Sequence, residues 1–484
     1  MQLSSLFEGA PKTEIKSLMS DSRIKSNKAL FFCLKGLVTD GHRFVTQAKE
    51  NGAIAVVYSD EFEYYDPELV YIKVTDVLDT LNQIAARFYH YCTKHMTIFG
   101  TTGTNGKSTI AWVTKYLVNH FEPTGYIGTI AIIYGDQVKE EHLTTPEVIY
   151  LHQTMYDMYK AGMKAVSLEV SSQGLDMHRC DSIDFNCAIF TNLTHEHLDY
   201  HLTFENYYQA KLRLFKMLGE KAPAIINVDD PFGVRLVKDT TGRPVTYSLN
   251  NPADYQAKKI QLYADHTEFV LVTADAQYPV KTNLLAMFNV YNLLASLVGV
   301  HETLGYSFEE LIPLCENIPQ VWGRVEKINE GQDLNVFVDY AHTTKKKKKL
   351  MTFIRTITPP DKRIIAVFGS AGGRDTKKRP AMGMIADKYC NIIILTSEDP
   401  RMENPEEIAK QIQKGIKNNT SMIIVDRYEA IRQGIELANT GDTVVILGKG
   451  DETFNAVKGI QTPWMSDPLA AKSAIAQYKS EQED

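Results

Sequence analysis

The feature that most constrains the fold is a short apolar segment that runs into a glycine-rich loop and then into a helical pattern. Met96–Gly100 has the composition of a β-strand, glycines recur at positions 100, 103 and 106, and Ile110–Leu117 has the pattern of a helix. Such glycines let backbone N–H groups converge on phosphate oxygens, Lys107 adds a positive charge, and the Ser108 hydroxyl can bind Mg²⁺. The loop is a variant, because the strict spacing requires glycine where Thr101 stands. We therefore predict an ATP site that includes Gly103, Thr104, Asn105, Gly106, Lys107, Ser108 and Thr109.

Apolar runs alternate with amphipathic stretches along the chain, which is typical of α/β proteins. A chain of 484 residues exceeds what one hydrophobic core usually serves. We expect three domains: a small α/β domain over residues 1–93, a central phosphate-loop ATPase domain with a mostly parallel sheet over 94–320, and a C-terminal Rossmann-like α/β domain over 321–484. The other predicted strands are Ala53–Tyr58, Leu69–Val74, Ala165–Glu169, Cys187–Phe190, Ala224–Val228, Val336–Asp339, Ile364–Phe368, Ile392–Leu395 and Val444–Leu447.

Composition excludes several classes of function. The net charge of −7 argues against a general nucleic-acid binder, which needs a basic surface. The chain begins without a basic segment followed by an apolar one, and no apolar run approaches the ~20 residues of a membrane span. The six cysteines are scattered, without a CxxC pair, which favours buried reduced thiols. We expect a cytoplasmic monomer that does not insert into membranes.

A carboxylate and several histidines follow predicted strands of the central domain. Glu169 ends a strand, where a carboxylate can reach a metal held by the phosphate loop, although a strand-end glutamate alone is more often structural. His195–Glu196 resembles the start of a zinc-protease motif, but Asp199 occupies the position of its second histidine. His197 and His201 are four residues apart, so a helical zinc pair remains an alternative.

These segments resemble the Mur ligases. The loop Thr102–Ser108 is similar to their ATP loop and to that of the related folylpolyglutamate synthetases, and Thr191–His201 matches a Mur signature except that Glu196 replaces Asp. The resemblance implies two Mg²⁺ sites, with Ser108, Glu169, His197 and Lys211 as ligands. It also implies that Lys211 carries CO₂ as a carbamate (N6-carboxylysine), whereas the helical pattern alone would make Lys211 a solvated lysine.

The resemblance assigns further residues to the nucleotide. Asn289 and Asn292 resemble the segment that contacts adenine, although Ala286 stands near where the family often has glycine. Arg324 and Asp339 match residues that reach the γ-phosphate and the nucleotide. An arginine that arrives on domain closure can stabilise the charge of a transferring phosphoryl group. The implied catalytic set is Lys107, His197, Lys211 and Arg324.

The N-terminal segments Asp21–Arg23, Leu30–Gly36 and Asp40–His42 resemble the UDP-binding domain of the UDP-N-acetylmuramoyl-tripeptide synthetases, which folylpolyglutamate synthetases lack. The implied reaction joins a basic amino acid to UDP-N-acetylmuramoyl-L-alanyl-D-glutamate. Residues that match contacts to this UDP-linked dipeptide are Ser22, Thr144, Thr145, Ser171 and Arg179.

The expected pocket for the added amino acid contains Arg374, Asp399, Arg401, Gly448 and Glu452. Family members that add meso-diaminopimelate usually have asparagine where this chain has Asp399. A carboxylate there would repel the distal carboxylate of diaminopimelate by on the order of 1 kcal/mol and attract the ammonium of lysine. We therefore expect L-lysine, with meso-diaminopimelate as the alternative.

The run Lys345–Lys349 departs from the family and is expected to be a solvated face, with phosphate steering as the alternative. Two other hypotheses remain. One is a catalytically silent paralogue that binds nucleotide, and the other is a Mur-like ligase that acts on a different glutamyl acceptor.

Overall fold

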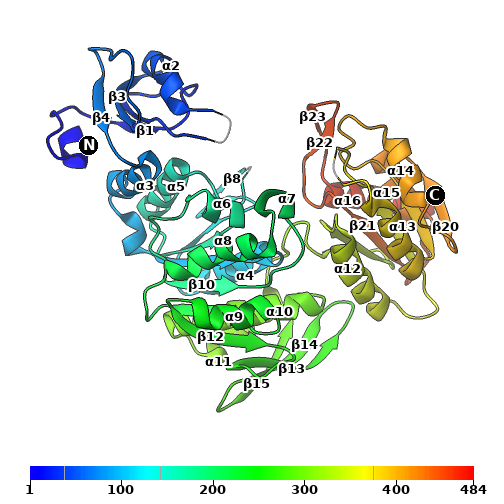
Figure 1. Ribbon diagram of the computed structural model, residues 1–484. Coiled ribbons are helices and arrows are strands. Elements are labelled where there is room, and N and C mark those ends of the chain that lie inside the picture. Colours follow the sequence, from blue (N-terminus) through cyan, green and yellow to red (C-terminus); the bar gives the residue numbers. More distant parts are fainter. Residues whose placement is uncertain (37–38, 142, 374, 484) are drawn as a thin grey trace. The chain divides into compact units, whose positions relative to one another are not determined.

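The computed structural model describes residues 1–36, 39–141, 143–373 and 375–483 (Figure 1). The chain divides into two compact units. The first contains Met1–Ala257, Leu271–Gln277 and Tyr291–Pro313, and the second contains Lys258–Val270, Tyr278–Val290 and Leu314–Asp484. The division passes through β13 (Tyr255–Leu262), β14 (Thr267–Val272), β15 (Gln277–Thr282) and α10 (Met287–Leu304).

The N-terminal part of the first unit is a small parallel sheet with helices. Its strand order is β1-β2-β3-β4, and every neighbouring pair is parallel. Parallel neighbours need crossover connections, and α2 lies in the one between β2 and β3. The elements are α1 (Leu3–Leu6), β1 (Ser17–Met19), β2 (Ala29–Phe32), α2 (Val45–Glu50), β3 (Ala53–Tyr58), β4 (Val70–Lys73) and α3 (Val77–Phe88).

The central sheet of the first unit is mostly parallel. Its order includes β12-β11-β10-β5-β9-β6, with the antiparallel strands β7 and β8 beyond β6. The register pairs Thr102 with Phe190 and Thr101 with Glu169, so the ends of β5, β9 and β10 meet at one edge. The strands are β5 (Thr97–Thr102), β6 (Thr124–Ile127), β7 (Ile132–Tyr134), β8 (Gln137–Lys139), β9 (Ala165–Glu169), β10 (Cys187–Phe190), β11 (Pro223–Asn227) and β12 (Arg243–Ser248).

Helices connect these strands and cover the sheet, so its central strands are buried on both faces and are mostly apolar. Both β9 and β10 are buried along their whole length. The helices are α4 (Lys107–Asn119), α5 (Val148–Lys160), α6 (Ser172–Asp176), α7 (Leu198–His201), α8 (Phe204–Lys216), α9 (Pro231–Asp239) and α11 (Phe308–Leu311).

The second unit contains a six-stranded sheet with the order β16-β17-β21-β18-β19-β20. Only β16 is antiparallel to its neighbour among these described strands. Alternate residues of each strand belong to two separate clusters: Phe337 and Ala366 to one, Val336 and Ile365 to the other. The strands are β16 (Glu326–Ile328), β17 (Asn335–Asp339), β18 (Ile364–Phe368), β19 (Ile392–Leu395), β20 (Thr420–Ile423) and β21 (Thr443–Leu447).

These two clusters are completed by helices, so the sheet is covered on both faces, as in doubly wound folds. One cluster includes residues of α12 (Thr344–Ile357), α13 (Lys378–Tyr389) and α14 (Pro405–Gln413), and the other includes α15 (Arg427–Glu436) and α16 (Asp467–Glu483). A two-stranded hairpin of β22 (Phe454–Val457) and β23 (Ile460–Pro463) was not predicted. The α/β fold class is confirmed.

One sequence expectation in the second unit holds for only part of a segment, because Lys345, Lys348 and Lys349 are exposed but Lys347 is not. Within the run Lys345–Lys349, which lies in α12, Lys347 is only 1% exposed. Lys347 shares a helix face with Leu350, Met351 and Ile354, which are all buried. The helical period, rather than the charge of the run, decides which lysine faces the core.

The described residues include no helix with the length and apolar composition that a membrane crossing requires. All six cysteines are buried and free.

Candidate functional site

The phosphate loop connects β5 to α4 and adopts a conformation that only glycine tolerates at two positions. Gly103 has φ 148° and Gly106 has φ 96°. A Cβ atom on Gly103 would lie 1.8 Å from Thr191 Oγ1, and one on Gly106 would lie 2.5 Å from Asn292 Oδ1. Glycine is therefore required at both positions for two reasons: the backbone has a positive φ, and neighbouring side chains lie too close for a Cβ atom.

Residues that follow β10 hold the loop from the neighbouring strand. The Asn105 N–H donates to Asn192 Oδ1 (3.1 Å), and the Thr191 hydroxyl donates to the Asn105 carbonyl (2.6 Å). The Thr104 N–H donates to the Asn192 carbonyl (2.8 Å). Two segments that the sequence marked separately, the loop and Thr191–His201, thus form one structure.

Lys107 and Ser108 open helix α4, whose N-terminus favours negative charge. The Lys107 ammonium donates to the carbonyls of Gly103 (3.0 Å) and Thr104 (3.2 Å), so its charge lies over the loop. The Ser108 hydroxyl donates to Glu169 Oε2 (2.9 Å). The next residue, Thr109, is buried. This end of α4 can therefore bind an anion through backbone N–H groups and the Lys107 ammonium.

Glu169 ends β9 and is fully buried. Besides Ser108, its carboxylate accepts from the Tyr126 hydroxyl (2.6 Å) and the Thr129 N–H (3.0 Å). Hydrogen bonds of this kind allow a carboxylate to remain in the interior. Glu169 therefore lies at the carboxyl end of its strand in direct contact with the residue that follows Lys107.

Lys211 and His197 both lie near the Tyr207 ring. The Lys211 ammonium is 4.5 Å from the ring centroid and the side chain is 2% exposed. Burial, together with the charge of Lys107, lowers the pKa of Lys211 well below its usual value. The centroids of His197 and Tyr207 are 6.1 Å apart, and burial likewise lowers the pKa of His197. Both side chains are thereby biased toward their neutral forms.

His201 does not join His197 in a zinc site. Its Nε2 is hydrogen-bonded to the Ser172 hydroxyl (2.9 Å), and its ring stacks on Tyr207. Within the described ranges, no group of three or more His, Cys, Asp or Glu side chains is arranged to hold a metal. The geometry therefore does not support the zinc-pair alternative.

Four of the residues predicted to contact the UDP-linked dipeptide are connected. The Arg179 guanidinium donates to the Thr145 carbonyl (2.9 Å), and the Ser171 N–H donates to the Thr145 hydroxyl (2.9 Å). The Thr145 hydroxyl donates to the Glu169 carbonyl (2.9 Å). Thr144 accepts from Thr129, which also binds the Glu169 carboxylate. This cluster is continuous with the carboxylate that faces the phosphate loop.

Ser22 lies instead in the turn between β1 and β2 of the small N-terminal sheet. Its hydroxyl donates to Gln47 Oε1 (2.7 Å), and Asn51 donates to its carbonyl. No recorded hydrogen bond or ion pair among the described residues joins Ser22 to the Thr145 cluster.

In the second unit, one chain of contacts links residues predicted for the nucleotide to residues predicted for the amino acid. The Arg324 guanidinium lies 4.7 Å from the centroid of the Tyr340 ring, and the Tyr340 hydroxyl donates to Glu452 Oε1 (2.5 Å). Lys449 then donates to Glu452 Oε2 and to Asp399 Oδ1, both at 2.9 Å. Tyr340 and Lys449 were not predicted, although the sequence marks Lys449 by the glycines on either side of it.

The other residues predicted for the second unit lie in several different elements. Asp339 ends β17 and accepts from the Val325 N–H (2.9 Å), and burial raises its pKa, opposed by Arg324. Arg401 and Gly448 both have positive φ, at 52° and 117°. The Asn289 amide donates to the Leu285 carbonyl (2.7 Å). Arg374 lies outside the described residues. Asn292 belongs to the first unit and is buried.

The structure weakens the electrostatic argument for lysine, although Lys449 divides its charge between Asp399 and Glu452. Asp399 Oδ1 binds the fully buried ammonium of Lys449 and also accepts from the Ala456 N–H (2.9 Å). A carboxylate that is already paired with a buried cation does not present a full charge to a substrate. The expected repulsion of a distal carboxylate by Asp399 is therefore not supported.

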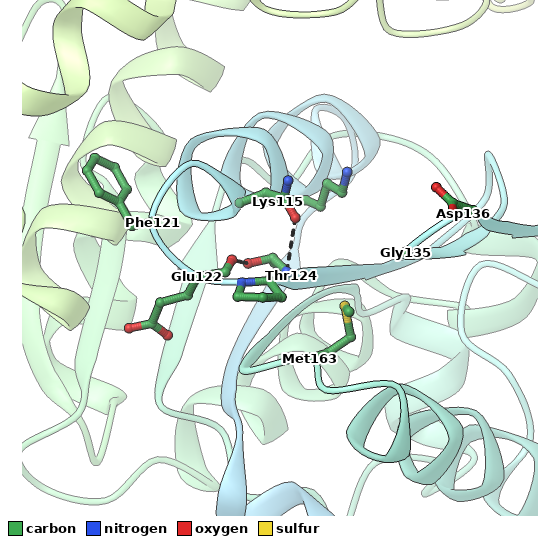
Figure 2. Close-up of a pocket in the computed structure, with 9 residues that line it drawn as sticks. Lys115, Phe121, Glu122, Thr124, Gly135, Asp136 and Met163 are labelled. Carbon is green, nitrogen blue, oxygen red and sulfur yellow. Dashed lines mark hydrogen bonds between the residues drawn. The ribbon is translucent and has the colours of Figure 1, made fainter.

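A pocket of about 340 Å³ lies at the other end of α4 (Figure 2). Lys115, Asn119 and Thr124 line it, and the Lys115 side chain extends toward Asp136. The twelve residue steps from Lys107 to Asn119 correspond to about 18 Å of helix, so this pocket is separate from the phosphate loop.

The comparisons with known proteins agree along the whole chain. Models of the Mur ligase family match three segments: the catalytic domain of the family over residues 14–89, the Mur ligase middle domain over 101–300, and the glutamate ligase domain over 323–450. The UDP-N-acetylmuramoyl-L-alanyl-D-glutamate–2,6-diaminopimelate ligase of Halalkalibacterium halodurans is 37% identical over 97% of this chain and 96% of its own. A similarly named ligase of Clostridium acetobutylicum is 39% identical over 93% of this chain and 92% of its own.

Solved structures give the same result. A UDP-N-acetylmuramoyl-L-alanyl-D-glutamate–2,6-diaminopimelate ligase superimposes with a TM-score of 0.73 at 29% identity and covers 99% of both chains. The MurF ligase of Thermotoga maritima in complex with ADP has a TM-score of 0.65 at 19% identity, covers 96% of this chain and 98% of its own, and shows a shared fold. The phosphate loop, the Thr191–His201 segment and these matches together lead to one conclusion: the chain belongs to the Mur ligase family.

Proposed function

We propose that this protein is an ATP-dependent ligase that joins 2,6-diaminopimelate to UDP-N-acetylmuramoyl-L-alanyl-D-glutamate in peptidoglycan synthesis. The observation that carries the proposal is the likeness, over nearly the whole chain, to ligases named for this reaction. Two contacts are consistent with ATP use by this chain. The phosphate loop is hydrogen-bonded to the Thr191–Asn192 segment, and Ser108 is hydrogen-bonded to Glu169.

Diaminopimelate replaces L-lysine as the favoured amino acid. The lysine expectation depended on a free Asp399 carboxylate, and that carboxylate is paired with Lys449. Arg401 is retained as a cation for a distal carboxylate, and the similar ligases carry diaminopimelate in their names.

The proposed reaction has two steps. One of the two free carboxylates of the terminal D-glutamyl residue attacks the γ-phosphorus of ATP, which forms an acyl phosphate and releases ADP. The amine of diaminopimelate then attacks the acyl carbon, so that the amide forms and inorganic phosphate leaves. Lys107 and Arg324 stabilise the charge of the transferring phosphoryl group. Asn289, Asn292 and Asp339 are the proposed contacts to the rest of the nucleotide.

The donor groups present have the chemistry that the two proposed Mg²⁺ sites need. Ser108 offers a hydroxyl and Glu169 a buried carboxylate, and His197 has a lowered pKa and is available as a neutral ligand. Lys211 is a buried amine with a lowered pKa, and only a neutral amine can take up CO₂ as a carbamate. Mg²⁺, when bound there, supplies positive charge that neutralises the phosphate oxygens.

The binding of both substrates follows the clusters in the two units. Thr144, Thr145, Ser171 and Arg179, with Ser22 from the small sheet, are the proposed contacts to the UDP-linked dipeptide. Asp399, Arg401, Gly448 and Glu452, with Arg374, are those to diaminopimelate. We also propose the three-domain division at residues 93 and 320, a monomer, and a cytoplasmic location, where the similar ligases would meet a UDP-linked precursor.

A competition assay tests the proposal. The purified protein receives ATP, Mg²⁺, the UDP-linked dipeptide and equal concentrations of L-lysine and meso-diaminopimelate, and mass spectrometry identifies the product. The diaminopimelate adduct should dominate. A lysine adduct would overturn the choice of amino acid, and phosphate release that needs no amino acid would overturn the ligase assignment.

A further inference from the structure

A lysine buried against the sheet of the second unit has no role in the function proposed above. Lys347 projects from α12 among apolar side chains and is 1% exposed, whereas its neighbours Lys345 and Lys348 are exposed. Burial of an ammonium is costly unless opposite charge or hydrogen bonds compensate it. A leucine or methionine would fill such a position at lower cost, so the charge itself needs an explanation.

The surroundings of Lys347 lie at the carboxyl ends of β18 and β19. Its ammonium is 3.7 Å from the centroid of the Phe368 ring and 3.5 Å from the Gly369 carbonyl, which is a long hydrogen bond. Burial lowers its pKa, and the carboxylate of Glu398 opposes that effect. The buried positive charge of Lys347 is therefore compensated mainly by the face of the Phe368 ring and by the charge of Glu398, rather than by a close hydrogen bond.

Glu398 is the complementary group. It is 5% exposed, and its Oε2 has no hydrogen-bond partner among the described residues. Burial raises the pKa of Glu398, and Lys347 is the strongest of the cations that lower it. Without Lys347, Glu398 would lose the strongest of the positive charges that oppose the rise of its pKa.

Two glycines pack directly against Glu398. A Cβ atom on Gly369 would lie 2.8 Å from Glu398 Cβ, and one on Gly448 would lie 2.2 Å from Glu398 Oε2. Gly448 begins the segment Gly448–Glu452, which we call the acceptor loop. Its Lys449 and Glu452 belong to the chain of contacts that reaches Asp399 and Tyr340. Glu398 thus packs against the first residue of the acceptor loop.

We infer that Lys347 is a positioning residue for the amino-acid substrate. The charge of Lys347 stabilises Glu398 in its place against Gly448. Through Glu398, Lys347 orients the acceptor loop that contacts diaminopimelate. The inference rests on the proposed function, because the acceptor loop has a substrate only if that function is right.

The effect should be confined to one substrate. Lys347→Met keeps the length and apolar stem of the side chain but removes its charge. The KM for diaminopimelate should rise on the order of tenfold, because Glu398, which packs against the acceptor loop, loses its strongest neighbouring cation. The KM for ATP should stay within about twofold, because none of the contacts described for Lys347 and Glu398 involves Arg324, the cation proposed for the γ-phosphate. Lys348→Met is the matched control, since Lys348 is exposed on the same helix.

A double-substitution cycle separates this role from general loosening of the fold. Glu398→Gln should raise the KM for diaminopimelate by a similar factor, and the Lys347→Met/Glu398→Gln variant should be no worse than either single variant. Additive effects, an equal rise in the KM for ATP, or an unchanged KM for diaminopimelate in Lys347→Met would overturn the inference. If Lys347→Met does not fold, Glu398→Gln, which keeps the size of the side chain, carries the same test. An inactive wild-type protein would instead refute the proposed function.

Discussion

At the scale of single residues, the phosphate loop tolerates least change. Gly103 has a φ of 148°, and a Cβ atom added to it would lie 1.8 Å from Thr191 Oγ1. Gly103→Ala should therefore destabilise the loop by about 1–3 kcal/mol and weaken ATP binding accordingly. Isothermal titration with ATP measures the effect. Gly219→Ala is the control, because nothing lies within 4 Å of its Cβ position, and equal affinities in the two variants would contradict the loop geometry described here.

Lys107 supplies charge rather than packing, since its ammonium lies over the carbonyls of Gly103 and Thr104. Lys107→Ala should lower kcat on the order of a hundredfold or more, because the phosphoryl group loses a preorganised cation. Circular dichroism should show an intact fold. Lys115→Ala, at the far end of the same helix, should retain activity, and a fully active Lys107→Ala variant would remove Lys107 from the mechanism.

At the scale of elements, α5 carries a buried histidine that makes stability depend on pH. His152 is 1% exposed, its Nε2 is hydrogen-bonded to the Ser182 hydroxyl (2.7 Å), and burial lowers its pKa to about 4. The unfolded chain protonates this histidine near pH 6.5, whereas the folded chain does so only near pH 4. Stability is thus unaffected above about pH 6.5 and falls as the pH decreases toward 4, by about 3 kcal/mol at most.

Urea denaturation at pH 7.5 and pH 5 measures this dependence. His152→Gln should flatten it, because glutamine keeps a polar group for Ser182 but does not titrate in this range. Substitution of the exposed His120 by Gln should leave the wild-type dependence unchanged. A variant at position 152 that loses as much stability as the wild-type protein between the two pH values would show that other groups control it.

The elements also show what the sequence can predict. Ala53–Tyr58, Ala165–Glu169 and Ile364–Phe368 are strands with the predicted bounds, because short, mostly apolar runs are the local signature of a buried strand. The burial of Lys347 was missed because five successive lysines obscure the apolar face on which the third of them lies. The pairing of Asp399 with Lys449 was missed because the two residues are 50 positions apart, and no local pattern encodes that contact.

At the scale of the whole molecule, the chemistry requires that ATP activate a carboxylate rather than react with water. Both units contribute to this account: the first holds the phosphate loop with Glu169, and the second holds the contacts from Arg324 to Asp399. An amide ligase of this kind transfers an oxygen atom from the substrate carboxylate to the phosphate that is released.

The most direct test follows that oxygen atom. The UDP-linked dipeptide is prepared with ¹⁸O in all oxygens of both free carboxylates of its D-glutamyl residue, and the protein is supplied with ATP, Mg²⁺ and diaminopimelate. Mass spectrometry of the inorganic phosphate should show one ¹⁸O atom per phosphate, formed together with the amide product. Unlabelled phosphate, or phosphate formed without amide, would contradict the account.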